Sequence, residues 1–258
     1  MPEETDVAVI GGGYGGLNCG LELARRGVRV AVFEAGAFGE GASTRNGGFV
    51  SGGIGAGARH GQRSDAFVAE GAAAMAHVEN VVVREGMDCF YRRDGRLIAA
   101  HSARAFDGLK RQAEAINKTA ATPWRVVERA CLDEELASPW YVGGVVVDEG
   151  ASVHPALYHR GLFDAARRAG AVLCGDAQVE AIARDGDGAV LRTARGMVRA
   201  REIVVTTNGY TGRVTPWLAR RVIPITTYIM ATEELGAERV RALIPNARTV
   251  GDTKRVLS

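Results

Sequence analysis

The chain opens on a short run of β-branched apolar residues, followed by glycines, a helical stripe and a second apolar run. Residues 7–10 form the first run and residues 28–33 the second. Between them, apolar residues such as Leu17 and Leu21 repeat at helical spacing until Gly27, which suits the position just after a helix. Continuous apolar runs are typical of parallel strands that are buried on both faces. The pattern predicts a βαβ unit.

Two further blocks of elements follow this unit. In the first block the predicted elements are helices, a hairpin and a strand, at residues 65–85 (helix), 90–98 (hairpin turning at Asp94-Gly95), 104–117 (helix), 132–136 (short helix) and 144–148 (strand). In the second block a helix over residues 154–168 begins near Pro155, since proline is tolerated in a first helical turn. Strands are predicted at residues 171–174, 178–183, 188–193, 197–200, 202–206 and 221–232. This alternation favours an α/β fold.

Glycines mark the junction between the first strand and the helix. They read Gly11-x-Gly13-x-x-Gly16, in which the first makes a tight turn, the second lets a pyrophosphate approach the backbone, and the third lets the helix pack closely. The helix N-terminus supplies N–H groups and partial positive charge for phosphates. Glu34 ends the second strand, where an acid accepts hydrogen bonds from ribose hydroxyls. We therefore predict a dinucleotide site, with these contacts: Gly11, Gly13, Tyr14, Gly15, Gly16, Glu34 and Ala35. A glycine turn without a ligand is the alternative.

The segment after Glu34 distinguishes NAD from FAD. Residues 36–50 are small and polar, which predicts a loop where an NAD domain would carry a helix. Such a loop can wrap a second phosphate and a ribityl chain. A further glycine cluster at residues 52–57 completes no second fingerprint, and we interpret it as a mobile segment.

One part of this loop resembles the Gly-Ala-Ser-x-Arg-Asn-Gly-Gly segment of the D-amino-acid oxidase-like family of FAD-dependent amine and amino-acid oxidoreductases. The matching residues here are Gly41, Ala42, Ser43, Thr44, Arg45, Asn46, Gly47 and Gly48. The resemblance implies FAD as the cofactor, with these residues lining its pyrophosphate, ribityl chain and flavin. It also implies that Val179 holds the adenine through its main chain, and that Thr207, Asn208 and Gly209 lie near the cofactor. From the residues alone, a core valine and a plain strand-end turn remain alternatives.

The resemblance extends to the whole architecture. It implies an α/β fold with a Rossmann-like FAD-binding domain that contains a β-meander, plus a smaller, incomplete α+β substrate domain. We expect the FAD-binding domain over residues 1–85 and 150–215, and the substrate domain over residues 86–149 and 216–258. The family's pattern continues past Ser258, and the chain stops inside a predicted strand. An N-terminal portion of a longer enzyme is therefore expected.

The activity implied by the resemblance is oxidation of the C–N bond of an amine or amino acid to an imine, with hydride transfer to flavin N5. Reduced FAD then passes its electrons to oxygen or another acceptor. No catalytic residue is assigned; Arg45 and Tyr228 are candidates to meet a substrate carboxylate, although structural roles are favoured for both. A truncated nucleotide-binding fragment without turnover is the alternative, and an NAD-dependent enzyme is disfavoured by residues 41–48.

Charge and composition narrow the classes of function. The 32 basic and 30 acidic residues are interleaved and give a formal net charge of +2, so no nucleic-acid stripe is predicted. No apolar run reaches about 18 residues, so no membrane span is predicted. The first six residues lack the basic and apolar pattern of a secretion signal, and a cytoplasmic location is expected.

Cysteines and histidines predict no metal site. The chain has four cysteines: Cys19, Cys89, Cys131 and Cys174. Their wide spacing argues against a structural zinc and against disulfides. Cys89 and Cys131 are candidates for covalent flavin attachment, but we interpret both as buried thiols. His154 and His159 are interpreted as the start and the surface of one helix.

Overall fold

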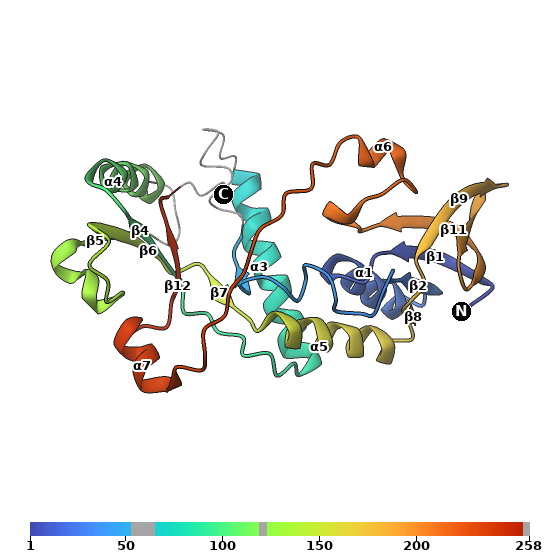
Figure 1. Cartoon of the computed structure of the whole chain (residues 1–258), viewed down its shortest axis with the longest axis horizontal. Helices are drawn as coiled ribbons and strands as arrows, with labels where there is room; N and C mark the ends of the chain where they lie inside the picture. Colours follow the sequence, from blue (N-terminus) through green and yellow to red (C-terminus); the bar gives the residue numbers. More distant parts are fainter. Residues whose placement is uncertain (53–64, 119–122, 255–258) are drawn as a thin grey trace. The chain divides into compact units, whose positions relative to one another are not determined.

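The structure is a computed structural model that describes residues 1–52, 65–118 and 123–254. It divides into two compact units (Figure 1). Unit 1 comprises Met1–Gly47, Glu85–Cys89 and Pro155–Ile229, and unit 2 comprises Gly48–Arg84, Phe90–His154 and Met230–Ser258. The predicted domains differ from these units mainly in residues 48–84 and 216–229, and their bounds stay a prediction. The glycine cluster predicted as a mobile segment lies outside the described residues, apart from Gly52.

Unit 1 is built on a six-stranded sheet in the order β8-β2-β1-β11-β10-β9. Its strands are β1 (Glu4–Ile10), β2 (Val30–Phe33), β8 (Val172–Cys174), β9 (Val179–Asp185), β10 (Gly188–Thr193) and β11 (Gly196–Val205). The pairs β8–β2, β2–β1 and β1–β11 are parallel, and β11–β10 and β10–β9 are antiparallel. The Rossmann-like sheet with a β-meander is therefore confirmed.

Strand β11 joins the two halves of this sheet. We predicted two strands over residues 197–200 and 202–206, but the chain forms one continuous strand. Its first part pairs antiparallel with β10, and its second part pairs parallel with β1, ending with Val205 opposite Ile10. Arg201, which the two predicted strands left out, and Glu202 are exposed positions within this long strand. The residues after β11 consequently emerge beside the end of β1.

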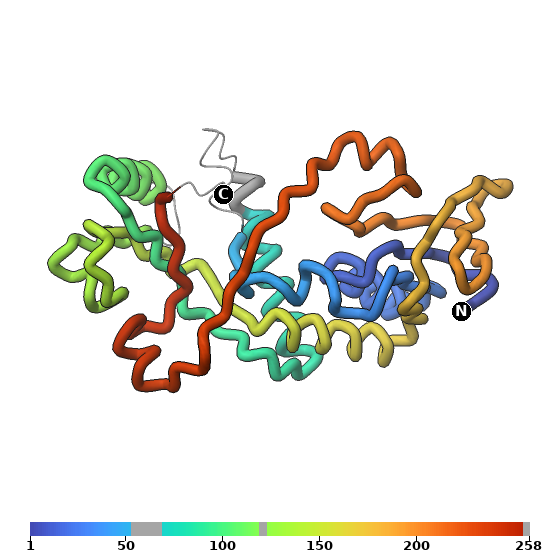
Figure 2. The backbone as a smooth tube through the Cα atoms, in the orientation of Figure 1, coloured from blue at the N-terminus to red at the C-terminus, as the bar shows by residue number. Residues whose placement is uncertain are grey.

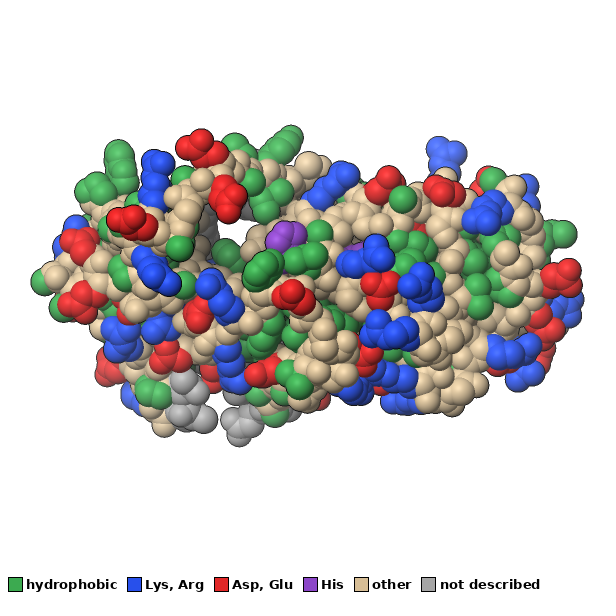
Figure 3. Space-filling model, turned by 90° about the horizontal axis from the view of Figure 1, so that it is seen from below, with side chains coloured by type: hydrophobic (Ala, Val, Ile, Leu, Met, Phe, Trp, Pro, Cys, Tyr) green, Lys and Arg blue, Asp and Glu red, His purple; other side chains and the backbone are tan. Residues whose placement is uncertain are grey.

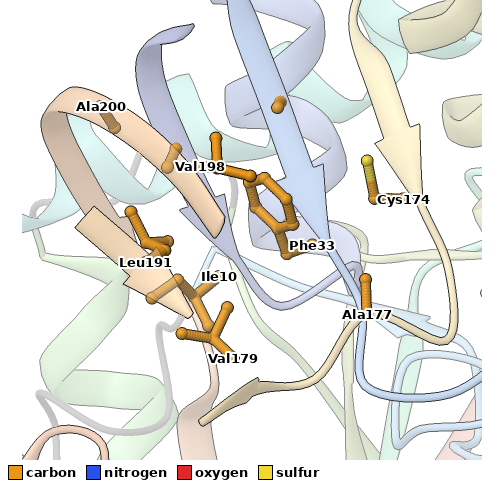
Figure 4. Packing of buried hydrophobic residues seen from close by; sticks show 10 residues of the cluster. Ile10, Phe33, Cys174, Ala177, Val179, Leu191, Val198 and Ala200 are labelled. Atoms are coloured by element: carbon orange, nitrogen blue, oxygen red, sulfur yellow. The ribbon is translucent and has the colours of Figure 1, made fainter. Parts of the chain in front are cut away.

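Helices α1 (Tyr14–Arg25) and α5 (Pro155–Arg168) pack against each other in unit 1 (Figure 1). Both were predicted, and Gly27 follows α1 with a φ of 76°. A Cβ on Gly20 would lie 2.8 Å from Cγ2 of Val32, so this glycine allows α1 to approach β2 closely. The opposite face of the sheet carries a cluster in which Phe33 and Val198 point toward each other (Figure 4).

Unit 2 contains a four-stranded sheet in the order β12-β4-β6-β5. These strands are β4 (Arg96–Ala100), β5 (Arg125–Glu128), β6 (Gly143–Val147) and β12 (Thr249–Asp252); its helices are α3 (Asp65–Glu85, whose last residue belongs to unit 1), α4 (Ala103–Asn117), the 3₁₀ helix η1 (Arg129–Glu134) and α7 (Gly236–Leu243). A two-stranded ribbon joins β3 (Phe49–Val50) to β7 (Ala151–Ser152). Figure 2 traces β12 alongside β4, although about 150 residues separate them along the chain. The predicted helices over 65–85 and 104–117 are confirmed.

Two predicted elements are wrong. The hairpin over residues 90–98 does not form, because β4 pairs with β6 and β12 while Arg92 pairs with Ser152. The strand over residues 221–232 is absent from the described chain, where these residues form no ladder and Ile223, Ile225 and Tyr228 are exposed. Strand β5 was not predicted, and the short helix near residue 132 is a 3₁₀ helix.

Basic and acidic side chains are interspersed on one face of the molecule. On the face drawn in Figure 3, Lys and Arg side chains are mixed with Asp and Glu.

The described helices are too short or too polar to span a membrane. Among the helices that the described residues form, none has both the length and the apolarity to cross a bilayer. Short helical segments also follow β11, namely the 3₁₀ helix η2 (Asn208–Tyr210) and α6 (Pro216–Ala219).

Glu135 is a buried carboxylate that ties the parts of unit 2 together. It is 4% exposed and accepts hydrogen bonds from Asn246 and Arg248, at 2.9 and 3.0 Å, and from Arg125. Burial by itself would raise the pKa of Glu135, but the hydrogen bonds from Asn246 and Arg125 and the charges of Arg248 and Arg125 outweigh it and lower that pKa. The ionised form therefore stabilises the folded unit.

We expect Glu135→Gln to lower the free energy of unfolding at neutral pH by roughly 1.5–3 kcal/mol, the range for charged hydrogen bonds. Because the folded-state pKa is depressed, the stabilisation is present above the ordinary value of 4.5 and is lost as the pH falls through the lower folded value. Urea unfolding across this acid range should show a smaller pH dependence in the variant. Glu128→Gln, which breaks an exposed pair with Lys110, is the control and should change little. Equal pH dependence of the wild-type and Glu135→Gln proteins would contradict the assignment.

Gly16 is the tightest contact in the turn from β1 into α1. A Cβ at this position would lie 1.8 Å from the carbonyl oxygen of Gly11 and 2.9 Å from Oγ1 of Thr206. The first of these atoms belongs to the backbone, so the turn itself would have to shift. At Gly108, in α4, a Cβ would meet no other described atom within 4 Å apart from its chain neighbours and the nearby backbone of its own helix.

We therefore expect opposite effects of the same substitution at these two glycines. Gly16→Ala should destabilise the chain by about 3 kcal/mol through overpacking. Gly108→Ala should stabilise it by roughly 0.5–1 kcal/mol, because alanine loses less backbone freedom in a helix. Urea unfolding followed by circular dichroism measures both. A stable Gly16→Ala variant would show that the turn is not tightly packed.

Candidate functional site

A cavity of about 820 Å³ opens in unit 1 at the carboxyl ends of the parallel strands β1, β2 and β11. Its walls are the glycine turn after β1, the loop after β2, the start of β9 and the segment after β11. This is where open α/β sheets bind their ligands, because strand ends and helix N-termini converge there. Of the predicted site residues, the lining includes Gly11, Gly13, Glu34, Ala35, Gly41, Ala42, Ser43, Arg45, Val179, Thr207 and Asn208.

The glycine turn is shaped by close contacts of its backbone. Gly11 has a φ of 107°, which favours glycine, and its N–H donates to the carbonyl of Phe33 at 2.8 Å. A Cβ on Gly13 would lie 2.8 Å from Oγ of Ser43. Ser43 therefore lies directly over Gly13, and both residues line the cavity.

The N-terminus of α1 faces the cavity. No side chain among the described residues caps the helix at Gly13, and its first turn contains no acid. The N–H of Tyr14 donates to Oγ of Ser43 at 3.1 Å. Within residues 1–52, 65–118 and 123–254, the N–H of Gly13 has no acceptor. A helix terminus with a free amide at a cavity wall suits an anion such as a diphosphate.

Glu34 is held in place by two backbone amides. Its Oε2 accepts from the N–H of Gly12 at 2.6 Å, and its Oε1 accepts from the N–H of Ala35 at 2.8 Å. Because an ionised carboxylate offers about four acceptor sites, two remain for ligand hydroxyls. The residue lines the cavity and is half-buried. The two remaining acceptor sites fit the two donor hydroxyls of the ribose of an adenine dinucleotide.

Two side chains of the loop after β2 form hydrogen bonds to the backbone of the same loop. Thr44 donates to the carbonyls of Gly39 and Gly41, and Asn46 donates to those of Ala42 and Ser43. These bonds fix the loop around Ser43. Contacts of Thr44 and Asn46 with a cofactor stay a prediction.

Other predicted site residues lie away from the cavity lining. Tyr14 donates its hydroxyl to the carbonyl of Pro155 at 3.1 Å, and its ring packs edge-on against Tyr158. Burial raises the pKa of Tyr14, so it acts as a neutral donor. Gly15 and Gly16 belong to the first turn of α1, and Gly48 is the first residue of unit 2. Gly47 and Gly209 also do not contribute to the lining.

The wall opposite the glycine turn comes from β9 and from the end of β11. Val179, 6% exposed, belongs both to the core cluster and to the cavity wall. Asn208 has a φ of 45° in the turn that follows β11. Tyr228, in contrast, is 89% exposed and is not part of the lining.

Sequence reasoning missed Thr206 and His159. Oγ1 of Thr206 donates to the carbonyls of Ile10 and Gly11 at 2.9 and 3.0 Å, so it fastens the end of β11 to the glycine turn. His159, predicted on a helix surface, is 4% exposed. Its helical spacing with Leu162 and Ala166, three and seven residues on, places it on the buried stripe of α5 and would have identified it. His154, predicted as the start of this helix, is exposed and immediately precedes α5.

All four cysteines are free. Cys89 is buried, as predicted, whereas Cys131 is exposed, so its interpretation as a buried thiol is wrong. Cys131 lies in η1, a 3₁₀ helix of six residues in which Leu132 is the one buried residue. The side chain of Cys131 therefore points to solvent.

A sheet whose strands β8, β2, β1 and β11 run parallel, with a cavity at the carboxyl ends of its strands, is typical of Rossmann-like nucleotide-binding proteins. A family profile described as FAD dependent oxidoreductase matches residues 6–256. Gamma-glutamylputrescine oxidoreductase of Escherichia coli K12 is 32% identical over 259 residues, covering 98% of this chain and 60% of the relative. The chain belongs to the family of FAD-dependent oxidoreductases, whose cofactor is FAD.

Solved structures share the fold of this chain. Glycine oxidase from Geobacillus kaustophilus matches with a TM-score of 0.72 and 27% identity, over 84% of this chain and 59% of that one. NikD, described as an unusual amino acid oxidase essential for nikkomycin biosynthesis, shares the fold at 21% identity, with a TM-score of 0.67, over 84% of this chain and 55% of that one. The chain spans about 60% of the length of the curated relatives it matches.

The role of Glu34 is directly testable. We expect Glu34→Ala to weaken FAD binding about 10- to 150-fold, because a charged hydrogen bond contributes roughly 1.5–3 kcal/mol. Titration followed by flavin fluorescence measures the affinity. Glu180→Gln removes another acid of the cavity wall and should bind FAD almost as the wild type does. Unchanged affinity in Glu34→Ala would exclude Glu34 from the site.

Proposed function

We propose that the cavity of unit 1 binds FAD, with the adenosine ribose on Glu34 and the diphosphate over the N-terminus of α1. The observation that carries this proposal is the N–H of Gly13 at the cavity wall, which has no acceptor among the described residues and lies next to the Glu34 carboxylate that two backbone amides hold in place. The volume of about 820 Å³ suits a large ligand, since small-molecule sites span roughly 300–1,000 Å³.

The remaining wall gives each part of the ligand a matching environment. Val179 offers apolar surface and main-chain groups to the adenine. Ser43, over the helix N-terminus, offers a hydroxyl to a phosphate oxygen. Residues 41–45 would line the ribityl and flavin portions. The acid at Glu34 would repel a 2′-phosphate, which favours FAD over a phosphorylated dinucleotide.

The whole protein is proposed to oxidise the C–N bond of an amine or amino acid to an imine. When bound, FAD supplies the chemistry by accepting a hydride equivalent at N5 from the carbon next to the nitrogen. The protein's own residues then need to hold, orient and enclose the reactants, with little side-chain acid–base chemistry. The charged side chains that line the cavity are Glu34, Glu40, Arg45, Glu180 and Arg213. We assign them to binding and orienting the ligand.

The class of substrate follows from the relatives. One is described as gamma-glutamylputrescine oxidoreductase and another as glycine oxidase, which act on a primary amine and on an amino acid. Arg45 is exposed at the cavity and is a candidate partner for a carboxylate or a phosphate. Oxygen or another acceptor would reoxidise the flavin.

We expect purified protein to carry or take up FAD, and its visible flavin absorbance to bleach when an amine substrate is added without oxygen. Glycine and gamma-glutamylputrescine are the first substrates to test, with NADH-dependent turnover measured in parallel. Bleaching by either amine supports the oxidoreductase proposal. FAD binding without bleaching by a wider panel of amines would indicate nucleotide binding without turnover. A protein that takes up no FAD would contradict the proposed site.

A further inference from the structure

His159 is a buried polar side chain on the apolar face of α5. It is 4% exposed and lies among Tyr158, Leu162, Ala165 and Ala166. Its Nε2 lies 2.8 Å from the carbonyl oxygen of Gly12 and it contributes to the cavity wall. Because a carbonyl oxygen only accepts, Nε2 carries the proton and donates it. The ring therefore binds the backbone of the glycine turn.

This hydrogen bond fixes the direction of the next amide. The peptide bond between Gly12 and Gly13 is planar and trans, so its carbonyl and its N–H point in opposite directions. With the carbonyl of Gly12 directed at His159, the N–H of Gly13 is directed away from the ring. That N–H is the amide at the cavity wall for which the described chain offers no acceptor.

The other side of the imidazole faces the loop after β2. A Cβ added to Gly39 of this loop would lie 3.6 Å from Nδ1 of His159, at ordinary van der Waals distance, so Gly39 lies near the ring. The carbonyl of Gly39 in turn accepts the hydroxyl of Thr44 at 2.6 Å. One ring thus lies between the turn after β1 and the loop that carries Ser43. These are the two segments that face each other across the N-terminus of α1.

We propose that His159 is a positioning residue for the diphosphate of the dinucleotide. By accepting its hydrogen bond, the carbonyl of Gly12 is held so that the N–H of Gly13 points toward a phosphate oxygen. The ring also maintains the spacing between the glycine turn after β1 and the loop after β2. The inference rests on the proposed FAD site and names a residue outside the glycine motif as part of its phosphate-binding geometry. In this proposal His159 acts on the diphosphate alone, and Glu34 binds the ribose.

The test compares ligands with and without a diphosphate. FAD and ADP contain it, and adenosine does not. His159→Leu removes the donor, and His159→Gln restores an N–H near the position of Nε2. His77→Leu makes the same change at an exposed histidine of α3. Affinities for ADP and FAD come from calorimetry and fluorescence, the affinity for adenosine from ligand-observed NMR, and the melting temperature of the apoprotein from scanning fluorimetry.

We expect His159→Leu to weaken ADP and FAD about 5- to 10-fold, the equivalent of one hydrogen bond, and to leave adenosine within about twofold. His159→Gln should recover most of the loss, and His77→Leu should bind as the wild type does. Wild-type affinity for ADP in His159→Leu would overturn the inference and leave the FAD site standing. An equal loss for adenosine, or a lowered melting temperature without recovery in His159→Gln, would overturn it in favour of a packing role. A wild-type chain that binds neither FAD nor ADP would refute the proposed function and this inference together.

Discussion

The architecture of unit 1 depends on how closely α1 approaches the end of β1. A hydrogen atom in place of a side chain at Gly16 lets the first helical turn rest against the carbonyl of Gly11, and a similar gap at Gly20 lets α1 lie against β2. Because the helix starts directly at the strand end, its N-terminal amides point across the carboxyl edge of the sheet. Any larger separation would remove them from the cavity.

Strand β11 supplies the second half of this arrangement. Its early residues pair with the meander and its late residues pair with β1, so a single strand carries the chain from the antiparallel part of the sheet to the cavity. Thr206 then fastens that end to the carbonyls of Ile10 and Gly11. The wall of the cavity is consequently formed by segments that are nearly 200 residues apart in the sequence and are joined directly by hydrogen bonds.

The sequence predicted those parts of the fold that depend on local spacing. The βαβ unit, α3, α4 and α5 show periodicities that persist over a whole element, and a glycine or proline marks the end of α1 and the start of α5. The prediction of a hairpin near Gly95 was wrong. Strand β4 pairs with β6, which lies more than 40 residues further along the chain, and no local sequence pattern specifies that pairing. The prediction of a strand over residues 221–232 was wrong, because a run rich in apolar residues does not by itself supply a neighbouring strand to pair with.

The candidate site was predictable to a similar degree. Gly11, Gly13 and Glu34 were recognised from their spacing, and the structure brings them together at one cavity. The direction of a backbone amide or the tautomer of a buried histidine depends on contacts between distant segments, as His159 and Gly12 illustrate. Such contacts become visible only when the helix α5 is placed beside α1.

The two amide bonds to Glu34 have a consequence for binding strength. A glutamate on an open surface samples many rotamers, and ordering it around a sugar costs conformational entropy of up to about 1.5–2 kcal/mol. Here the carboxylate is already immobilised between the amides of Gly12 and Ala35. Much of that entropic loss is incurred when the chain folds, so a nucleoside arriving at this edge meets a preorganised acceptor.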